Sequence, residues 1–159
     1  MLIPQTVYIE TSIVSYLTAR PSRDLIVAAN QQITDEWWEN HRNHFQLYIS
    51  SLVVKEAKRG DKEAAQKRLQ ILQEIPILEW NAEVLELAEH FVTKKALTEK
   101  ARNDALHVAT AMIHDLDYLL TWNCRHIANE EIQKKIAKIG AEMGYEMPRI
   151  CTPFTLKGD

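Results

Sequence analysis

The feature that most constrains the fold is a regular alternation of short apolar runs with longer amphipathic stretches. The apolar runs are typical of buried strands, and they occupy residues 3–9, 45–50, 75–80 and 117–122. The segments between them are long enough to hold a helix, which is what the crossover between two parallel strands requires. The sequence therefore predicts an α/β protein, a three-layer α/β/α sandwich with a mainly parallel central sheet.

The segments between the strands carry the periodicity of helices. Between residues 22 and 43, apolar side chains recur every four residues at Leu25, Ala29, Ile33 and Trp37, which indicates one buried stripe. Similar patterns predict further helices over 61–73, 81–95, 101–115 and 129–143. Glycines at 140 and 144 are suitable for ending the last of these.

Length and composition indicate one globular domain over residues 1–159, without linkers or repeats. The chain is 46% hydrophobic and 26% charged, and its formal charge of -3 excludes a uniformly basic surface but not a local basic rim. Two cysteines and an N-terminus unlike a signal peptide favour reduced thiols in the cytoplasm. No stretch is apolar enough to span a membrane, so we expect a soluble protein with no membrane contact.

Four polar side chains stand at strand ends or early helical turns. Glu10 follows the first strand, Glu56 lies a few residues after the second, Asp104 begins the helix over 101–115, and Asn123 ends the fourth strand. Parallel strands bring such positions to one edge of the sheet, where α/β proteins bind ligands. We therefore expect these side chains to converge. Ser51 is placed to cap the helix that carries Glu56.

Crowded carboxylates repel one another, and a divalent cation removes that conflict. Oxygen ligands suit Mg²⁺ or Mn²⁺, which complete their shells with water and phosphate. An activated water at such a centre can attack a phosphodiester. We expect Thr11, Ser15 and Thr121 to form a supporting polar shell, while Arg125 and His126 are candidates for phosphate contacts.

Each of these residues also has an ordinary structural interpretation. Glu10 can serve as an acid favoured by a helix N-terminus, Asp104 and Asn123 can cap local structure, and Glu56 can be a solvated helix residue. His41 and His44 have a spacing that can chelate a metal, but no further ligand is evident and a structural role is favoured.

Three aromatic residues also have alternative interpretations. His107 lies one turn from Asp104 and can pair with that carboxylate, contact substrate or simply pack. Trp37 and Trp38 are adjacent on one helix, so one of them is a candidate for exposure at a protein interface, with packing as the favoured alternative.

The segments VYIETSIVSYL, ISSLVVKEAKRGD, ARNDALHVATA and DYLLTWNCRHIAN, in this order, resemble PIN-domain nucleases, particularly the VapC-like toxins of type II toxin–antitoxin systems. The resemblance implies a parallel sheet between helices and a Mg²⁺- or Mn²⁺-dependent endoribonuclease. Its acidic quartet falls on Glu10, Glu56, Asp104 and Asn123. It also implies an RNA substrate, a cognate antitoxin protein as partner, and a homodimer.

The sequence departs from the family pattern at two of these positions. Glu10 is one methylene longer than the aspartate of the pattern, and Asn123 keeps an oxygen donor but removes a negative charge, which favours a single tightly held ion. A catalytically inactive PIN-fold module that binds RNA or protein is therefore the alternative to the nuclease. A small-molecule phosphohydrolase would share the metal site and is a third interpretation.

Overall fold

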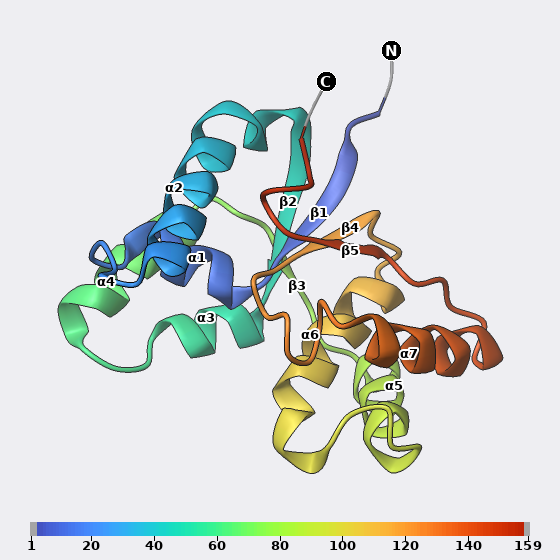
Figure 1. Cartoon of the computed structure of the whole chain (residues 1–159). Helices are drawn as coiled ribbons and strands as arrows, with labels where there is room; N and C mark the ends of the chain where they lie inside the picture. Colours follow the sequence, from blue (N-terminus) through green and yellow to red (C-terminus); the bar gives the residue numbers. More distant parts are fainter. Residues whose placement is uncertain (1–2, 158–159) are drawn as a thin grey trace.

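The central sheet has five parallel strands in the order β3-β2-β1-β4-β5. This computed structural model describes residues 3–157, so the ends of the predicted domain, residues 1–2 and 158–159, lie outside the description. The strands are β1 (Gln5–Ile9), β2 (Phe45–Ser50), β3 (Ile77–Leu78), β4 (Tyr118–Leu120) and β5 (Arg149–Cys151). Because every pairing is parallel and helices cover both faces, the predicted α/β/α sandwich is confirmed (Figure 1).

The helices divide between the two faces of the sheet as strand order requires. The chain moves outward in one direction from β1 to β3 and in the other from β3 to β5, and right-handed crossovers then place the two sets of helices on opposite faces. One face carries α1 (Thr11–Thr18), α2 (Leu25–Asn40), α3 (Ser51–Ala57) and α4 (Lys62–Leu72), and the other carries α5 (Ala82–Thr93), α6 (Arg102–Ile113) and α7 (Glu130–Glu142) (Figure 1). Within the described residues, no helix has the length and apolar character needed to cross a membrane.

The sheet is built around β1, the most deeply buried strand. Val7, Tyr8 and Ile9 have no exposed surface, because β1 is flanked by β2 and β4 and covered on both faces. Strand order reverses between β1 and β4, so the crevice beyond their carboxyl ends is the expected ligand position in such a sheet. Ile9 pairs with Leu120, and the residues that follow them, Glu10 and Thr121, therefore lie side by side at this crevice.

Two strands differ from the prediction. The strand expected over 75–80 is reduced to Ile77–Leu78. Pro76 bonds to β2 only through its carbonyl, which accepts the Ile49 N–H at 3.0 Å, because proline has no N–H to donate. The segment Arg149–Cys151 was not predicted as a strand, but it pairs with β4 as β5. Three residues are too few to show the apolar pattern of a strand. The segment becomes a strand because it pairs with the edge of β4 that β1 leaves unpaired.

One local prediction is wrong. Ser51 is the first residue of α3 and not its cap; Ser50 occupies the cap position, but its hydroxyl lies 2.7 Å from the Tyr8 phenol oxygen and makes no capping bond. For the adjacent tryptophans the favoured alternative, packing, is confirmed, since Trp37 is 1% and Trp38 8% accessible. Trp37 stacks near Phe45, while the guanidinium of Arg42 covers the ring of Trp38.

The helices α5, α6 and α7 are each followed by a residue in the left-handed backbone conformation. Gly144, with φ 88, follows α7 as predicted, whereas Lys95 (φ 63) follows α5 and Asp115 (φ 53) follows α6. Aspartate tolerates this conformation better than most residues, and lysine carries a Cβ penalty that glycine avoids. The backbone N–H groups of Ala96 and Leu97 both donate to the Phe91 carbonyl, which holds Lys95 in this conformation.

Replacing Lys95 by glycine should stabilise the protein by about 0.5–1 kcal/mol, because it removes the steric cost of a left-handed side-chain-bearing residue. Urea unfolding of Lys95→Gly measures the change, with Asp115→Gly as the matched substitution, for which a smaller gain is expected. A Lys95→Gly protein no more stable than the wild type would contradict this account of the α5 terminus.

Candidate metal centre

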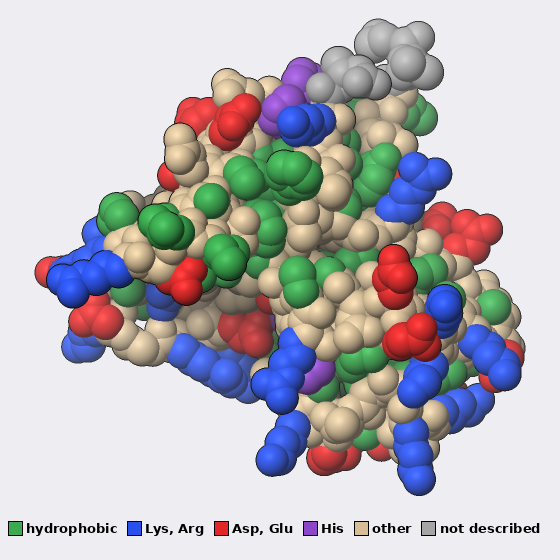
Figure 2. Space-filling view, viewed as in Figure 1, with side chains coloured by type: hydrophobic (Ala, Val, Ile, Leu, Met, Phe, Trp, Pro, Cys, Tyr) green, Lys and Arg blue, Asp and Glu red, His purple; other side chains and the backbone are tan. Residues whose placement is uncertain are grey.

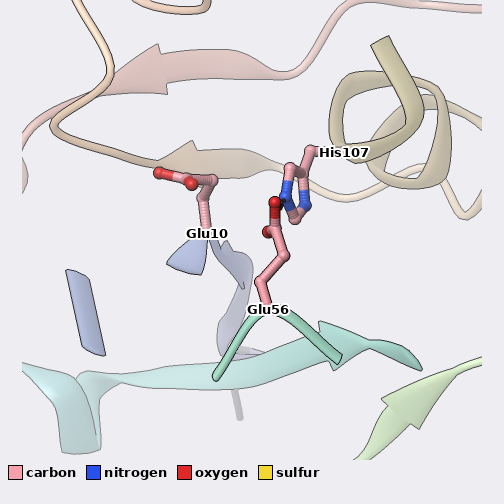
Figure 3. Close-up of side chains that lie close together, drawn as sticks. All are labelled: Glu10, Glu56 and His107. Carbon is pink, nitrogen blue, oxygen red and sulfur yellow. Dashed lines mark hydrogen bonds and ion pairs between the residues drawn. The ribbon is translucent and has the colours of Figure 1, made fainter. Parts of the chain in front are cut away.

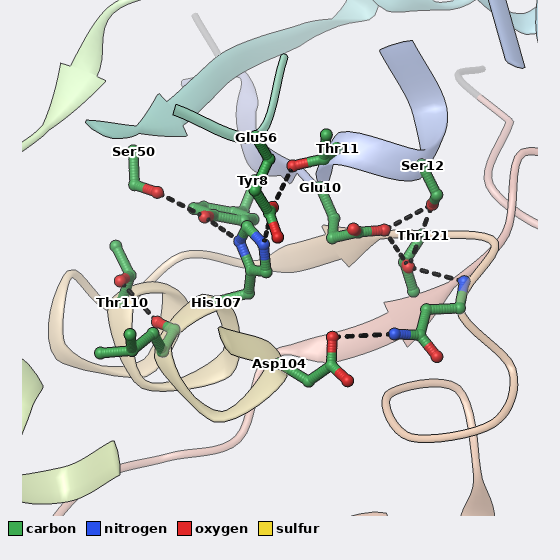
Figure 4. Close-up of polar contacts among 12 residues, drawn as sticks. Tyr8, Glu10, Thr11, Ser12, Ser50, Glu56, Asp104, His107, Thr110 and Thr121 are labelled. Atoms are coloured by element: carbon green, nitrogen blue, oxygen red, sulfur yellow. Dashed lines mark hydrogen bonds and ion pairs between the residues drawn. The ribbon is translucent and has the colours of Figure 1, made fainter. Parts of the chain in front are cut away.

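The candidate site lies at the carboxyl edge of the sheet, beside the crevice between β1 and β4. Glu10 follows β1, Glu56 lies in α3, and α6 supplies Asp104 and His107. These elements come from both faces of the sheet and meet only at this edge (Figure 4). Figure 4 also shows Glu10 lying between the Glu56–His107 pair and the hydroxyls of Ser12 and Thr121.

Glu10 is a buried carboxylate, 6% accessible, and hydroxyl groups hold it. Thr121 Oγ1 donates to Glu10 Oε1 at 2.5 Å, and the Ser12 hydroxyl donates to the same oxygen. Both hydroxyls are themselves oriented, since the backbone N–H of Trp122 donates to Ser12 and that of Asn123 donates to Thr121. Glu10 occupies the cap position of α1, which agrees with an acid favoured by a helix N-terminus, but its carboxylate makes no capping bond and is held by the two hydroxyls instead.

Glu56 is held in the same manner from the other side. Its Oε1 accepts a hydrogen bond from the Thr11 hydroxyl at 2.6 Å and lies 2.7 Å from His107 Nε2. Within residues 3–157, no donor reaches Oε2 of either Glu10 or Glu56. Each carboxylate is therefore fixed through one oxygen and leaves the other free for a ligand.

A buried chain of polar groups supports Glu56 from behind. His107 is 1% accessible, and its Nδ1 lies 2.6 Å from the Tyr8 phenol oxygen, which in turn lies 2.7 Å from Ser50 Oγ. When the imidazole is protonated, both ring nitrogens donate, Nε2 to Glu56 and Nδ1 to Tyr8, and the Tyr8 O–H then donates its hydrogen bond to Ser50 Oγ. Burial also raises the pKa of Tyr8 well above its ordinary value, which keeps the phenol neutral.

The charges of this pair favour an ion pair between imidazolium and carboxylate. Burial alone would lower the pKa of His107, but the hydrogen bond to Glu56 and the charges of Glu10, Glu56 and Asp104 raise it above 6.5. Burial alone would raise the pKa of Glu56, but the hydrogen bond and charge of His107, with the Thr11 hydroxyl, hold it below 4.5. The two shifts have one cause and reinforce each other.

Asp104 belongs to a neighbouring cluster. Its Oδ1 accepts from the Asn123 side-chain amide at 2.9 Å, and its Oδ2 lies 2.8 Å from His126 Nδ1. The Asn123 oxygen accepts the backbone N–H of His126 at 3.1 Å, which fixes the amide with its NH₂ group toward Asp104. Asn123 thus caps the turn after β4, as its structural interpretation holds, and also orients Asp104. No capping bond of α6 involves Asp104.

The structure brings some of the predicted residues together and leaves others apart. Donor atoms of Glu10, Glu56 and His107 all lie within 4.8 Å of one another (Figure 3). Among residues 3–157, the Ser15 hydroxyl makes no hydrogen bond, and the exposed Arg125 makes no side-chain contact with the acids. Of the predicted shell, Thr11 and Thr121 do contact carboxylates.

Sequence reasoning missed the groups behind the carboxylates. His107 was weighed as a partner of Asp104, yet it pairs with Glu56, and Tyr8 was read only as part of a buried strand. A signal existed, because Tyr8 carries a hydroxyl into a strand with no exposed surface, and such a group needs a partner. No other trio of His, Cys, Asp and Glu in the described chain gathers in this way, and the structural role favoured for His41 and His44 stays a prediction.

This donor set fits a hard divalent cation. Glu10 and Glu56 offer their free Oε2 atoms, and carboxylate oxygens are the ligands that Mg²⁺ and Mn²⁺ prefer. Protonated His107 cannot act as a ligand, and its role is to hold Glu56. Asp104 is close enough for its charge to act on His107, and it supplies a third acid at the edge of the centre.

In protein stripped of divalent metal, His107 should titrate above its ordinary value of 6.5, and Glu56→Gln should lower that pKa because the amide carries no charge. The protonated form then stabilises the fold below the unfolded-state pKa, and this contribution is lost as pH rises through the folded-state pKa. NMR titration of the imidazole resonance, assigned by a His107→Asn variant, measures both values. Equal midpoints in the two proteins would refute the ion pair.

Comparison with known proteins bears on this geometry. A family model for the PIN domain matches residues 7–138. No curated protein sequence matches significantly. Among solved structures, VapBC2 from Rickettsia felis, determined with a DNA fragment from its promoter, shares 19% identity and a TM-score of 0.55, with 93% of this chain and 98% of that chain aligned.

A second solved structure is VapC20 of Mycobacterium tuberculosis, a toxin described as cleaving the sarcin–ricin loop. It shares 16% identity and a TM-score of 0.60, with 77% of this chain and 93% of that chain aligned. At these identities the likeness establishes the fold. The family model, however, matches most of the sequence, from β1 into α7. The protein belongs to the PIN-domain family.

Proposed function

We propose that this protein is a Mg²⁺- or Mn²⁺-dependent endoribonuclease and the toxin of a toxin–antitoxin pair. The observation that carries the proposal is the meeting of Glu10 and Glu56 at the sheet edge, each fixed through one oxygen and free at the other. PIN-domain membership supports the nuclease chemistry, and the structural likeness to VapC20, a toxin described as cleaving the sarcin–ricin loop, agrees with it.

Some residues would bind the cation, and others would fix the side chains that bind it. Glu10, Glu56 and Asp104 would bind the cation, with Asn123 and His126 holding Asp104 in place. The bound cation would supply charge to stabilise phosphate oxygens and would acidify the attacking water. Ser12 and Thr121 keep Glu10 from rotating, and preorganisation of this kind is what makes electrostatic stabilisation effective.

The rim of the centre suits a polyanionic substrate. Arg125 is exposed and next to His126, and these two residues would contact phosphates that flank the scissile bond. The charge of Arg59 also reaches Glu56 from the end of α3. We further propose a cognate antitoxin as partner, in keeping with the VapBC2 structure that shares the fold. We also propose a homodimeric state and a cytoplasmic location.

One observation favours a second candidate, an inactive PIN-fold module that binds RNA or protein. Both oxygens of Asp104 already have hydrogen-bond partners, and the Glu56–His107 ion pair neutralises part of the acidic charge. The acidic side chains at this edge of the sheet can therefore keep their arrangement without a bound cation. Metal binding and RNA cleavage separate the two candidates.

Calorimetric titration of Mn²⁺ into the purified protein should show saturable binding. We expect Glu10→Gln to abolish it and Asp104→Asn to weaken it by about 10–100-fold, since Asp104 stands at the margin of the closest donor set. Glu146→Gln, which removes an exposed carboxylate outside the site, is the matched control. Identical titrations for all four proteins would exclude a metal at these acids.

Cleavage assays should show Mn²⁺-dependent hydrolysis of RNA that EDTA stops, with no release of phosphate from a simple phosphomonoester. Asp104→Asn should lower the cleavage rate by about 100-fold or more, because it removes one of the acids that hold the reacting groups. Metal binding without RNA cleavage would replace the nuclease by the inactive module. Hydrolysis of the monoester would instead identify a small-molecule phosphohydrolase.

A further inference from the structure

We call Glu10, Glu56 and Asp104 the acidic centre. A second charged feature lies outside it, on the face of the sheet that carries α5 and α7. A surface cavity of about 380 Å³ is lined by Lys94, Lys95, Lys135, Lys138, Ile139 and Glu142. We call these four lysines the lysine pocket. The first two follow the end of α5 and the other two lie on α7, so tertiary packing and not a local run of sequence gathers them. Figure 2 shows Lys and Arg side chains clustered over this part of the surface.

The charge balance of the lysine pocket is unusual for this protein. Four lysines face one glutamate around the cavity, although the whole chain has a formal charge of -3. Lys94 lies 3.3 Å from Glu142, whereas Lys95, Lys135 and Lys138 form no ion pair with any residue of the described chain. Like charges held around one cavity repel, and an anionic ligand relieves that repulsion.

Lys95 adds an observation independent of charge. It occupies the left-handed position after α5, where glycine would fold at lower cost. The residue that carries this backbone strain is also one that lines the cavity. Strain that persists in a native structure points to a role outside stability.

A short segment of chain connects the lysine pocket to the acidic centre. α6 runs into β4, so its first turn, which carries Asp104, lies at the carboxyl edge of the sheet. The short connection through Glu99–Ala101 joins that turn to the end of α5 at Lys94 and Lys95, and it carries the exposed Lys100. A polyanion bound at the acidic centre can thus continue over this connection toward the pocket.

We propose that the lysine pocket binds backbone phosphates of the RNA substrate, beyond the scissile bond. The inference rests on the proposed nuclease function and deepens it. Lysine ammonium groups act as point charges and read no base edges, so the pocket contributes affinity and a preference for longer RNA, without sequence selectivity. It needs no metal, in contrast to the acidic centre.

The direct test is fluorescence anisotropy with a labelled single-stranded RNA of mixed sequence, in EDTA, over a series of salt concentrations. Lys135→Gln/Lys138→Gln should bind about three- to tenfold more weakly at low salt. Its salt dependence should also be shallower by about 1.4 in log–log slope, or about 0.7 for each lost phosphate contact. Lys62→Gln/Lys67→Gln on α4 removes the same charge from exposed positions outside the pocket and should match the wild type.

Lys95→Gly separates binding from folding. It should raise the melting temperature and still weaken RNA binding, a combination that loss of structure cannot produce. Equal affinities and slopes for the two double variants would overturn the proposal, as would a wild type that binds no RNA in EDTA. Loss of binding to purified antitoxin, with RNA binding intact, would also overturn it and assign the pocket to an acidic protein segment.

Failure of this inference differs from failure of the proposed function. If the wild type cleaves RNA with Mn²⁺ and the pocket variants bind RNA normally, the proposed nuclease function stands and only the role of the lysine pocket is refuted. If the wild type binds RNA through the lysine pocket but cleaves none, the proposed nuclease function is refuted and the pocket stands as a phosphate-binding surface.

Discussion

Burial of the Glu10 carboxylate beside Glu56 and His107 is the constraint on which the rest of this site depends. The two carboxylates meet at the end of the most buried strand, where water screens their charges poorly. Unfavourable burial of charge is tolerated only when donors surround it. The chain accordingly places a hydroxyl or an imidazole against each carboxylate, from Thr11, Thr121 and His107.

The register between β1 and β4 transmits this arrangement across the site. Pairing of Ile9 with Leu120 sets Glu10 beside Thr121, and two residues later Asn123 reaches Asp104 on the opposite face. One short segment after β4 therefore positions both acidic clusters. A slip of one residue would turn each of its side chains to the other face of the sheet and dismantle both.

Charge is distributed so that the acidic centre and the lysine pocket occupy separate places in a chain with formal charge -3. The centre concentrates negative charge that a cation can neutralise, and the pocket offers positive charge for a polyanion. The short connection before α6 relates them, because it ends one helix at Lys95 and begins the helix that carries Asp104. Under the proposed function, catalysis and RNA affinity would depend on different residues.

The sequence by itself determined the architecture and the positions of the acids, since strand and helix periodicities are local and parallel strands share one edge. It predicted that Glu10, Glu56, Asp104 and Asn123 stand at strand ends or early helical turns near one edge of the sheet. Only tertiary structure decided their partners: His107 turns to Glu56 and not to Asp104, and β5 forms because β4 has a free edge. Hydrogen bonds between residues far apart in the chain depend on packing angles and rotamers, and no local pattern encodes these.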